Sequence, residues 1–346
     1  MAPYGSVTAL GPHILDVLGR PVESIPPGQG AAMLTEIRAT AAGTAAGAAV
    51  DLAKLGARVY SAGAIGDDLI GDVVVAALRR HGVDTTGLVR KPGVQTSATM
   101  LPIRPNGERP ALHVPGASRR LQVADIDAAA IARCDALLFG GPDALSGLAA
   151  AELREVGAAA SAAGVLVVVD VLYGGSRRAL ERLCGLLGCA DWFWPNEEQL
   201  LALTGRDELP AAIDDVLRLG TGGVAVTLGA RGCLLATQQV PEPVPIPAIS
   251  VDVVDTTGCG DAFNAGMLTG LLLGSDPADS AWLGVACGAL VATGLGSDAG
   301  IASLGQAVEF LAAAAPETAA RIGARIAALA VGQARTEPRQ ERRGDG

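Results

Sequence analysis

The middle of the chain alternates between short apolar segments and longer segments with helical periodicity. The apolar segments have the length and composition of strands and lie at 58–64, 136–139, 165–170, 191–194 and 224–228. Short, uninterrupted apolar runs are typical of parallel strands that are buried on both faces. Helical patterns separate them, for example at 69–81, 144–163 and 177–187. This alternation predicts an α/β fold in which a mostly parallel central sheet is flanked by helices.

Two regions interrupt the alternation, at 11–40 and 96–115. The first is rich in proline and glycine, and in the second Asn106-Gly107 separates two β-like runs, which is a strong hairpin signal. We expect both regions to form a small β-structure that acts as a lid; a hairpin without a function is the alternative. One domain is expected over 1–332, ending in an Ala-rich helical stretch at 306–330. A disordered tail of mixed charge is expected at 333–346.

Net charge, cysteine spacing and apolar segments indicate which kinds of binding partner the protein is expected to have. The formal net charge is −10 and no block of Lys and Arg precedes the C-terminus, which disfavours a general nucleic-acid binder. The six cysteines form no C-x-x-C pair, so zinc and redox motifs lack support. The uncharged stretch 280–297 is rich in small residues and is expected to be a buried core helix, and no signal peptide is indicated. We therefore expect a cytoplasmic protein that handles small molecules and binds neither nucleic acid nor membrane.

The segment 251–266 carries the strongest chemical signal in the chain. Its first four residues are of strand type, a glycine-rich turn follows, and then a helix is expected. The first N–H groups of a helix point at one spot, where the positive end of the helix dipole also lies. Because Gly258 and Gly260 let the backbone approach closely, this helix start is predicted to form an anion hole for a phosphate group.

Asp261 lies beside this predicted anion hole. A carboxylate there can accept the proton of an attacking hydroxyl, and phosphoryl transfer otherwise needs mainly positioning and charge stabilisation. An isolated Asp at a helix start is most often a cap, but the flanking strand-type residues and the Asp255-Thr-Thr lead-in favour catalysis here. Asp255 and Thr257 are further oxygen donors, which could position Mg²⁺ through water or hold a monovalent cation such as K⁺.

The run from Asp255 to Gly266, DTTGCGDAFNAG, resembles the second signature of the PfkB, or ribokinase-like, carbohydrate kinases. Four further landmarks follow the order of that family. They are a run similar to the first signature at 42–56, a turn similar to G-x-D-x-x-G at 64–72, a Pro-Asn-Glu element within 191–198, and a turn similar to Thr-x-Gly-x-x-Gly at 226–232. Together these resemblances cover roughly residues 10–311.

The resemblance implies a ribokinase-like three-layer sandwich with a small β lid. It also implies ATP as phosphoryl donor, Mg²⁺ as helper, a sugar hydroxyl as acceptor and Asp261 as general base. The N–H groups of Gly258, Cys259 and Gly260 would form the anion hole. Nucleotide, phosphate and Mg²⁺ would be held by Asn196, Glu197, Thr227, Gly229 and Gly232, with Asp255, Thr257 and Glu197 near the metal. The acceptor would be held by Asp16, Gly43 and Gly47. Homodimers formed through the lid are common in such a family.

The sequence departs from the family pattern in its first signature. Ala42 replaces one glycine, and Gly47 stands where an Asn that binds the sugar is expected. The candidates to supply that contact from the lid side are His13, Arg104, Asn106 and His113. Gln199 also replaces a Glu that some relatives carry, which the neighbouring Glu197 and Glu198 could compensate.

Several alternatives stay open at this point. Asp170 ends a predicted strand, and it either assists substrate binding or caps the following loop. A dinucleotide-binding Rossmann enzyme and a P-loop kinase are disfavoured, because neither G-x-G-x-x-G after the first strand nor Gly-Lys-Ser/Thr occurs. A nucleoside kinase, or a catalytically weak or silent sugar-binding or nucleoside-binding relative, is the alternative function. The acceptor is open between ribose, fructose, a deoxygluconate and a nucleoside.

Overall fold

The computed structural model describes residues 3–336, and these contain a nine-stranded sheet with the order β13-β12-β11-β10-β9-β8-β1-β4-β5. Its strands are β1 (Ser6–Leu10), β4 (Arg58–Gly66), β5 (Asp84–Lys91), β8 (Ala136–Gly140), β9 (Leu166–Asp170), β10 (Trp192–Phe193), β11 (Gly223–Thr227), β12 (Cys233–Thr237) and β13 (Val244–Ile246). Neighbours from β11 to β5 run parallel, whereas β12 and β13 extend one edge antiparallel. The predicted mostly parallel central sheet is therefore confirmed.

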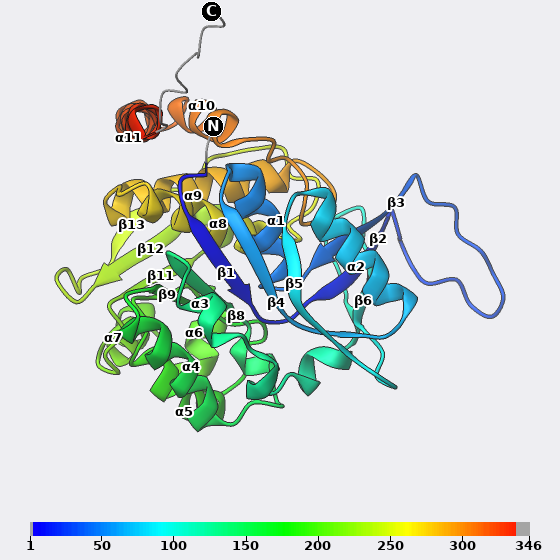
Figure 1. The fold of residues 1–346 in the computed structure, drawn as a ribbon. Helices are drawn as coiled ribbons and strands as arrows, with labels where there is room; N and C mark the ends of the chain where they lie inside the picture. The colour runs from blue at the N-terminus through cyan, green and yellow to red at the C-terminus, as the bar shows by residue number, and fades with distance from the viewer. Residues whose placement is uncertain (1–2, 337–346) are drawn as a thin grey trace, which may run out of the picture.

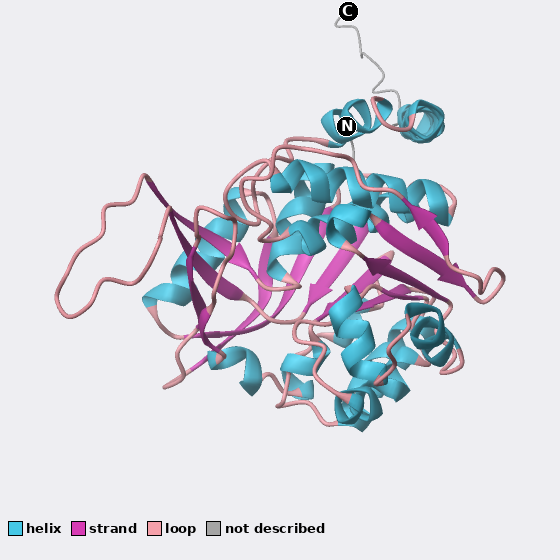
Figure 2. Ribbon diagram, turned by 180° about the vertical axis from the view of Figure 1, so that it is seen from behind, coloured by secondary structure: helices cyan, strands magenta, loops and turns pink. Residues whose placement is uncertain are grey.

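Helices cover both faces of this sheet, which gives the three layers seen in Figure 1 and, from behind, in Figure 2. One face carries α1 (Ala46–Leu55), α2 (Leu69–Arg80), α8 (Cys259–Leu272) and α9 (Pro277–Ala292). The other carries α3 (Ala128–Ile131), α4 (Ala150–Ala162), α5 (Arg177–Leu187), α6 (Glu197–Thr204) and α7 (Leu209–Leu217). Most of α9 is buried, as predicted for 280–297. No helix within residues 3–336 combines the length and apolar character needed to cross a bilayer.

A second, four-stranded sheet lies to one side of the molecule (Figure 1). Its strands are β2 (Ile14–Arg20), β3 (Glu36–Ala42), β6 (Ser97–Pro102) and β7 (Leu112–Val114), in the order β3-β2-β6-β7. They come from the two regions predicted to form a small β-structure. β6 and β7 pair antiparallel around Asn106-Gly107, as the hairpin signal predicts. Their connection is longer than a two-residue turn, because the tight turn itself is closed between Arg104 and Glu108.

Two predicted helices have different bounds in the structure, for local reasons. The helix predicted over 144–163 begins only at Ala150, and the N–H before it is capped by the carboxylate of Glu152 at 2.7 Å. The stretch 306–330 is divided into α10 (Leu304–Ala312) and α11 (Pro316–Thr336). Proline suits the first position of a helix because its missing N–H has no partner there. α11 passes the predicted start of the tail at 333, and residues 337–346 lie outside the described residues.

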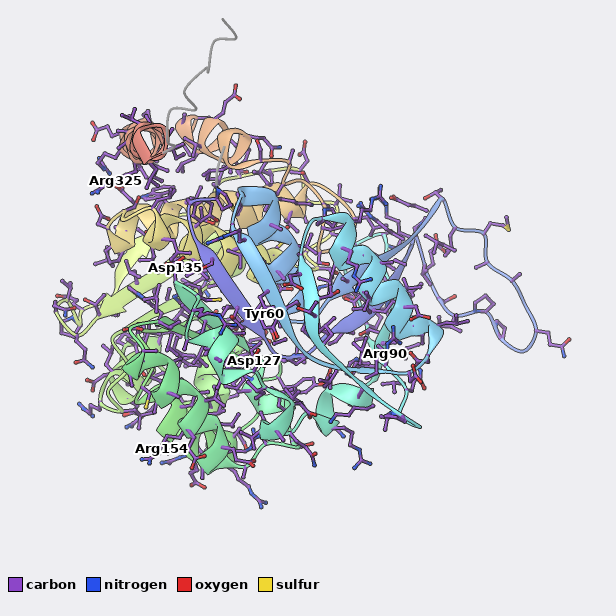
Figure 3. The ribbon with its side chains drawn as sticks, in the orientation of Figure 1. Tyr60, Arg90, Asp127, Asp135, Arg154 and Arg325 are labelled. Atoms are coloured by element: carbon purple, nitrogen blue, oxygen red, sulfur yellow. The ribbon has the colours of Figure 1, made fainter. Side chains whose placement is uncertain are left out.

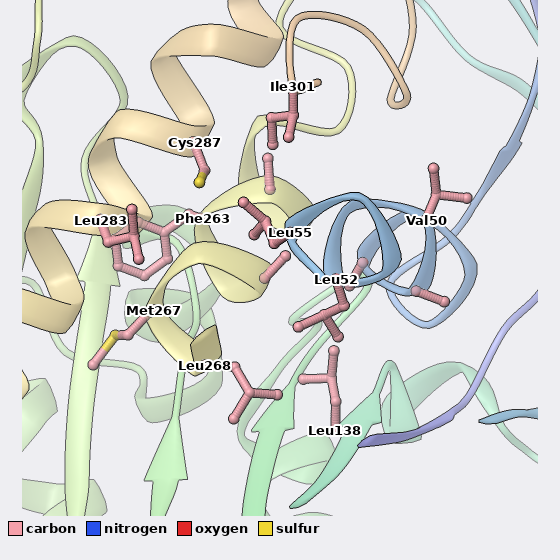
Figure 4. Close-up of a cluster of buried hydrophobic side chains, with 14 of the residues drawn as sticks. Val50, Leu52, Leu55, Leu138, Phe263, Met267, Leu268, Leu283, Cys287 and Ile301 are labelled. Atoms are coloured by element: carbon pink, nitrogen blue, oxygen red, sulfur yellow. The ribbon is translucent and has the colours of Figure 1, made fainter. Parts of the chain in front are cut away.

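Close packing of α1, α8 and α9 holds the start of α8 in place. Leu52 of α1 and Met267 of α8 belong to one buried cluster (Figure 4). Gly266 lets α8 and α9 approach so closely that an added Cβ would lie 2.6 Å from a carbonyl oxygen of α9. Arg90, near the end of β5 (Figure 3), forms an ion pair with Asp72 of α2 at the surface.

Candidate active site

A cleft of about 570 Å³ lies at the carboxyl ends of β9, β10 and β11, the edge at which α/β sheets bind ligands. Its walls are formed by Thr44, Arg109, 170–172, Trp194, 196–199, 227–229, Thr256, 258–261 and Asn264. The predicted site residues that line it are Gly258, Cys259, Gly260, Asp261, Asn196, Glu197, Thr227 and Gly229. Those that do not line it are Asp16, Gly43, Gly47, Gly232, Asp255 and Thr257.

The start of α8 presents free main-chain N–H groups to this cleft. Gly258 adopts a left-handed conformation with φ 82°, and an added Cβ would lie 2.4 Å from the Cα of Ser297. Only glycine fits such a turn. The N–H of Cys259 donates to a carbonyl of the preceding turn at 3.3 Å, whereas the N–H groups of Gly258, Gly260 and Asp261 have no acceptor within the described chain. The free donors at the positive end of the helix dipole are therefore those of Gly258, Gly260 and Asp261.

The residues before this turn form a loop, and the strand predicted at 251–254 is wrong. The loop is instead tied to α9, because the N–H of Val254 donates to the carbonyl of Ala292 at 2.8 Å. The buried carboxylate of Asp255 accepts the N–H and the hydroxyl of Thr257 and the N–H of Gly296, at 2.8–3.0 Å. Asp255 and Thr257 thus brace the loop, and neither lines the cleft. This arrangement does not support the metal-ligand role predicted for them.

Asp261 sits half-buried in the cleft wall, in close contact with α1. An ideal Cβ built on Gly47 would lie 2.4 Å from its Oδ2 and 3.0 Å from its Cγ. Gly47 therefore gives Asp261 its place by having no side chain. Burial and, to a smaller extent, the neighbouring charge of Asp16 raise the pKa of Asp261 to about 7, against the opposing effect of Arg109. The carboxyl can therefore both take up and release a proton near neutral pH.

Asp170 combines the two roles that the sequence left open. One carboxylate oxygen accepts the N–H of Val171 at 2.7 Å and so caps the loop after β9. The other accepts the side-chain N–H of Asn264, on α8, at 2.8 Å. Burial, followed by the charge of Asp261, raises the pKa of Asp170 well above its usual range. The pair of Asp170 and Asn264 therefore forms a polar wall of the cleft beside the candidate base.

The N-terminus of α6 forms the opposite wall. Asn196 caps this helix: its Oδ1 accepts the N–H of Gln199, and Gln199 Oε1 accepts the N–H of Asn196, both at 2.8 Å. Gln199 also donates to the carbonyls of Val171 and Leu172, which ties α6 to the loop after β9. Such a reciprocal cap fixes the start of a helix. The Gln in place of the relatives' Glu is thus used structurally.

Glu197 and Glu198 are the acidic side chains of this wall. Glu197 forms an ion pair with Arg231, whereas Glu198 has no ion pair within the described residues. No group of three or more His, Cys, Asp or Glu side chains in residues 3–336 is arranged to hold a metal. Mg²⁺ commonly binds through one or two carboxylates, water and substrate phosphates. The two glutamates fit that mode of binding and not a site made by protein alone.

The turn after β11 supplies backbone to the same wall. Thr227 and Gly229 line the cleft, and nothing would contact a Cβ added at Gly229, so its backbone stands free toward the opening. Gly232 is needed for another reason: an added Cβ would lie 2.0 Å from the carbonyl oxygen of Ile246. Its φ of 91° is also one that glycine favours. Gly232 therefore shapes the turn without lining the cleft, and its predicted contact with the nucleotide stays a prediction.

The inner face of the four-stranded sheet carries a row of polar side chains. The strand register aligns Thr40, Asp16, Thr99 and His113 across β3, β2, β6 and β7. His113 Nδ1 lies 3.0 Å from the hydroxyl of Thr99. Burial raises the pKa of Asp16 to about 6, while the hydroxyl of Thr99 and the charge of Arg109 act the other way. Asp16 acts on the pKa of Asp261, so this row faces the candidate base.

The other lid-side candidates lie elsewhere. His13 is a core residue, with Nε2 2.6 Å from the hydroxyl of Ser61, and burial lowers its pKa to about 4. Arg104 pairs with Glu108, and Asn106 accepts the N–H of Glu108 at 3.1 Å, so both stay in the hairpin. Gly43 has φ 88° and forms the turn before α1. Of the lid-side candidates, His113 alone joins the polar row on the inner face.

Among the residues that line the cleft, sequence reasoning gave no role to Arg109 and Thr44. Arg109, on the loop between β6 and β7, donates from Nε to the hydroxyl of Thr256 at 3.2 Å. It is the guanidinium that acts on both Asp16 and Asp261. Thr44, in the turn before α1, is buried and its hydroxyl has no partner within the described chain. Only their nearness to the predicted hairpin and first signature could have drawn attention to them.

Comparisons with known proteins agree with the fold. Residues 7–304 match the model of the family described as pfkB family carbohydrate kinase. The chain is 30% identical to the deoxyribokinase of Salmonella typhi over 64% of this chain and 71% of that protein, and 30% identical to fructokinase-1 of Oryza sativa subsp. japonica over 78% and 86%. The structure of Arabidopsis thaliana ribokinase complexed with ribose and ATP shares the fold, with a TM-score of 0.75, 23% identity and coverage of 90% and 99%. The chain belongs to the pfkB family of carbohydrate kinases and is an ATP-dependent sugar kinase.

Proposed function

We propose that the cleft transfers the γ-phosphoryl group of ATP to a hydroxyl of a sugar or sugar-like molecule, with Asp261 as general base. One observation carries this proposal. The Asp261 carboxyl, with a pKa of about 7, stands next to the free N–H groups of Gly260 and Asp261 in one cleft. A base whose pKa lies near the working pH is well suited to take the acceptor's proton. Fixed N–H donors stabilise the charge that develops on the phosphoryl oxygens.

The nucleotide is proposed to bind along the α6 wall. Thr227 and the free backbone at Gly229 lie at the end of β11, and Asn196 adds a side-chain amide. When bound there, Mg²⁺ supplies neutralisation of phosphate charge. Glu197 and Glu198 are the carboxylates that would hold it through water. Dependence on K⁺ stays a prediction. A comparison of the rate of ADP release in KCl and in NaCl tests it. The predicted cytoplasmic location also stays a prediction, which cell fractionation tests.

The acceptor is proposed to bind between Asp261 and the four-stranded sheet, which would act as its lid. Asp16, Thr99 and His113 offer hydrogen-bonding groups in one row. Such a row suits a molecule with several hydroxyl groups. A nucleoside is the second candidate, because the half-exposed ring of Tyr173 meets His113 edge to face with ring centroids 6.4 Å apart. These two rings would give a nucleobase a surface to pack on.

An ADP-coupled screen tests the proposal. The acceptors are ribose, deoxyribose, fructose, 2-dehydro-3-deoxygluconate and adenosine, each with ATP and Mg²⁺. We expect ADP release that depends on one acceptor and that Asp261→Asn abolishes. Acceptor-dependent ADP release that persists in Asp261→Asn would contradict the base assignment. Ligand binding without turnover in any assay would favour the catalytically silent alternative.

We also propose that the outer face of the four-stranded sheet forms a homodimer. Its exposed side chains are apolar: Ile37, Met100 and Leu112 are 70%, 59% and 54% exposed. The register places Met100 opposite Leu112 and opposite Val17, all on the face away from Asp16. Exposed apolar patches of this kind mark interaction surfaces. Light scattering should give twice the chain mass for the native protein and a monomer for Met100→Glu; a native monomer at micromolar concentration would refute the dimer.

A further inference from the structure

The buried carboxyl of Asp51 has no role in the site described so far. Asp51 lies on α1 and is 0% exposed, and neither of its oxygens has a hydrogen-bond partner within the described chain. A carboxylate placed in such surroundings is strongly destabilising, because burial removes its hydration without replacing it. A group of this kind either holds its proton or serves a neighbour.

The geometry of α1 directs Asp51 toward the candidate base. Asp51 follows Gly47 by four residues, so both lie on the same face of the helix, one turn apart. Side chains of a helix lean toward its N-terminus, so that of Asp51 leans toward Gly47. The carboxylate of Asp261 packs against Gly47 at a distance that a Cβ there would not allow. Gly47 therefore brings two carboxyls to one turn of α1.

The charges around Asp51 decide which form it takes. Burial is the largest effect and raises its pKa well above the usual range. Asp261 on α8 and Asp298 after α9 act in the same direction, and Lys54 on α1 opposes them. The ammonium of Lys54 is occupied by the carbonyl of Asp298.

The remaining groups that face the two carboxyls do not reverse this result. Cys287 on α9 and Cys259 on α8 are the thiols near Asp51, and burial raises the pKa of both, so they are neutral. Asp261 is faced in addition by Asp16 and by the guanidinium of Arg109. Its charge also acts on Asp170, which is itself buried. Asp51 therefore keeps its proton while Asp261 ionises near neutral pH.

We propose that Asp51 is a positioning residue that, as a neutral acid, donates a hydrogen bond to the carboxylate of Asp261 through one buried water. Such a bond stabilises the ionised form of the base and restrains its orientation. It therefore opposes the burial that would otherwise hold Asp261 protonated. The importance of this pair for catalysis rests on the proposed function, but the existence of the pair does not.

Nuclear magnetic resonance of the full chain, labelled with ¹³C at the aspartate carboxyls, tests the pair without any acceptor. The Asp261 signal is assigned by its loss in Asp261→Asn, and that of Asp51 by its loss in Asp51→Asn. In Asp51→Leu, which has no donor, we expect the pKa of Asp261 to rise by about one unit, the scale of a hydrogen bond to a charged group. In Asp51→Asn, whose amide still donates, we expect no comparable rise. Asp72→Asn, on the exposed face of α2, is the control and should change nothing.

Two results overturn the proposal. If the pKa of Asp261 is the same in native protein, Asp51→Leu and Asp51→Asn, the two groups do not interact. If it falls in Asp51→Asn, then Asp51 is charged in the native protein and repels the base. If Asp51→Leu does not fold, the Asp51 signal of the native protein decides the question. The carboxyl of Asp51 must then stay protonated above pH 7 in the native protein, and the pKa of Asp51 must be lower in Asp261→Asn. Failure of every acceptor in the kinase screen would refute the proposed function and leave this test unaffected.

Discussion

Replacing Gly47 by alanine is the sharpest test of how the base is placed. The added Cβ would lie 2.4 Å from Oδ2 of Asp261, whereas non-bonded heavy atoms rest at about 3.5 Å. The carboxylate must therefore retreat by about 1 Å. A misplacement of that size in a reacting group lowers turnover about a hundredfold. We expect a loss of that order in kcat for Gly47→Ala.

Stability should move little in the same variant. The atoms that must give way are the free end of one side chain and not main chain, so the fold can absorb the methyl group. Alanine inside a helix is more favourable than glycine by about 0.8–1.0 kcal/mol, which offsets the remaining strain. The melting temperature should therefore stay within about 2 °C of the native value. This separates a misplaced base from a damaged fold.

The assay is ADP release with the acceptor found in the screen, alongside thermal melting. Gly323→Ala is the matched control, because it makes the same change inside α11 where nothing lies within 4 Å of the new Cβ. It should keep full activity. If Gly47→Ala is as active as this control, then Asp261 does not act from the position that the structure gives it, and the proposed base geometry is refuted.

The remaining predictions concern the charge of the site. Asp261→Asn should leave ATP binding near normal and lower turnover by at least about a hundredfold, measured by calorimetry and ADP release. The pKa of about 7 predicts that kcat/KM falls tenfold per pH unit below neutrality; an acid limb centred near pH 4 would contradict it. Because that pKa is raised in the folded state, folding binds a proton between about pH 4 and 7, and the stability that this proton contributes is lost as pH rises through 7. Asp261→Asn should therefore melt higher than native protein at pH 8. Arg109→Gln should shift the acid limb to higher pH, because the guanidinium of Arg109 stabilises the ionised form of Asp261. Thr256→Val should remove only the hydrogen bond that anchors Arg109. An unshifted acid limb in Arg109→Gln excludes an effect of Arg109 on the base.

The elements of the main sheet were predictable because their signals are local. The run at 165–170 is apolar without interruption, and β9 begins within one residue of its predicted start. α5 has the predicted bounds, Arg177–Leu187. The strand predicted at 251–254 failed because a short apolar run can equally be held by a helix end, here the carbonyl of Ala292. Pro316 indicates the break between α10 and α11, because proline favours the first position of a helix. The prediction of one helix over 306–330 relied on the alanine-rich periodicity and did not use this proline.

The site was predictable where backbone makes it and unpredictable where distant side chains meet. The glycine-rich turn at 258–260 identifies free N–H groups by its pattern alone, although the N–H of Asp261 is free and that of Cys259 is not. The pattern does not show that the carboxylate of Asp255 accepts the N–H of Gly296, 41 residues away. Nor does it show that Arg109 donates to the hydroxyl of Thr256, 147 residues away. Such contacts depend on how the four-stranded sheet and α9 are placed relative to α8, and no local pattern specifies that placement.

The protonation state of the site is the least predictable property, and it explains how an acidic cleft can hold an anionic nucleotide. Burial raises the pKa of Asp16, Asp170 and Asp261, and in addition the charge of Asp16 acts on Asp261 and that of Asp261 acts on Asp170. Carboxyls so close together do not all ionise near neutral pH. The cleft therefore carries protons where the sequence shows negative charges, and Arg109 adds a positive one. A net charge of −10 consequently says little about the potential that a phosphate meets at the start of α8.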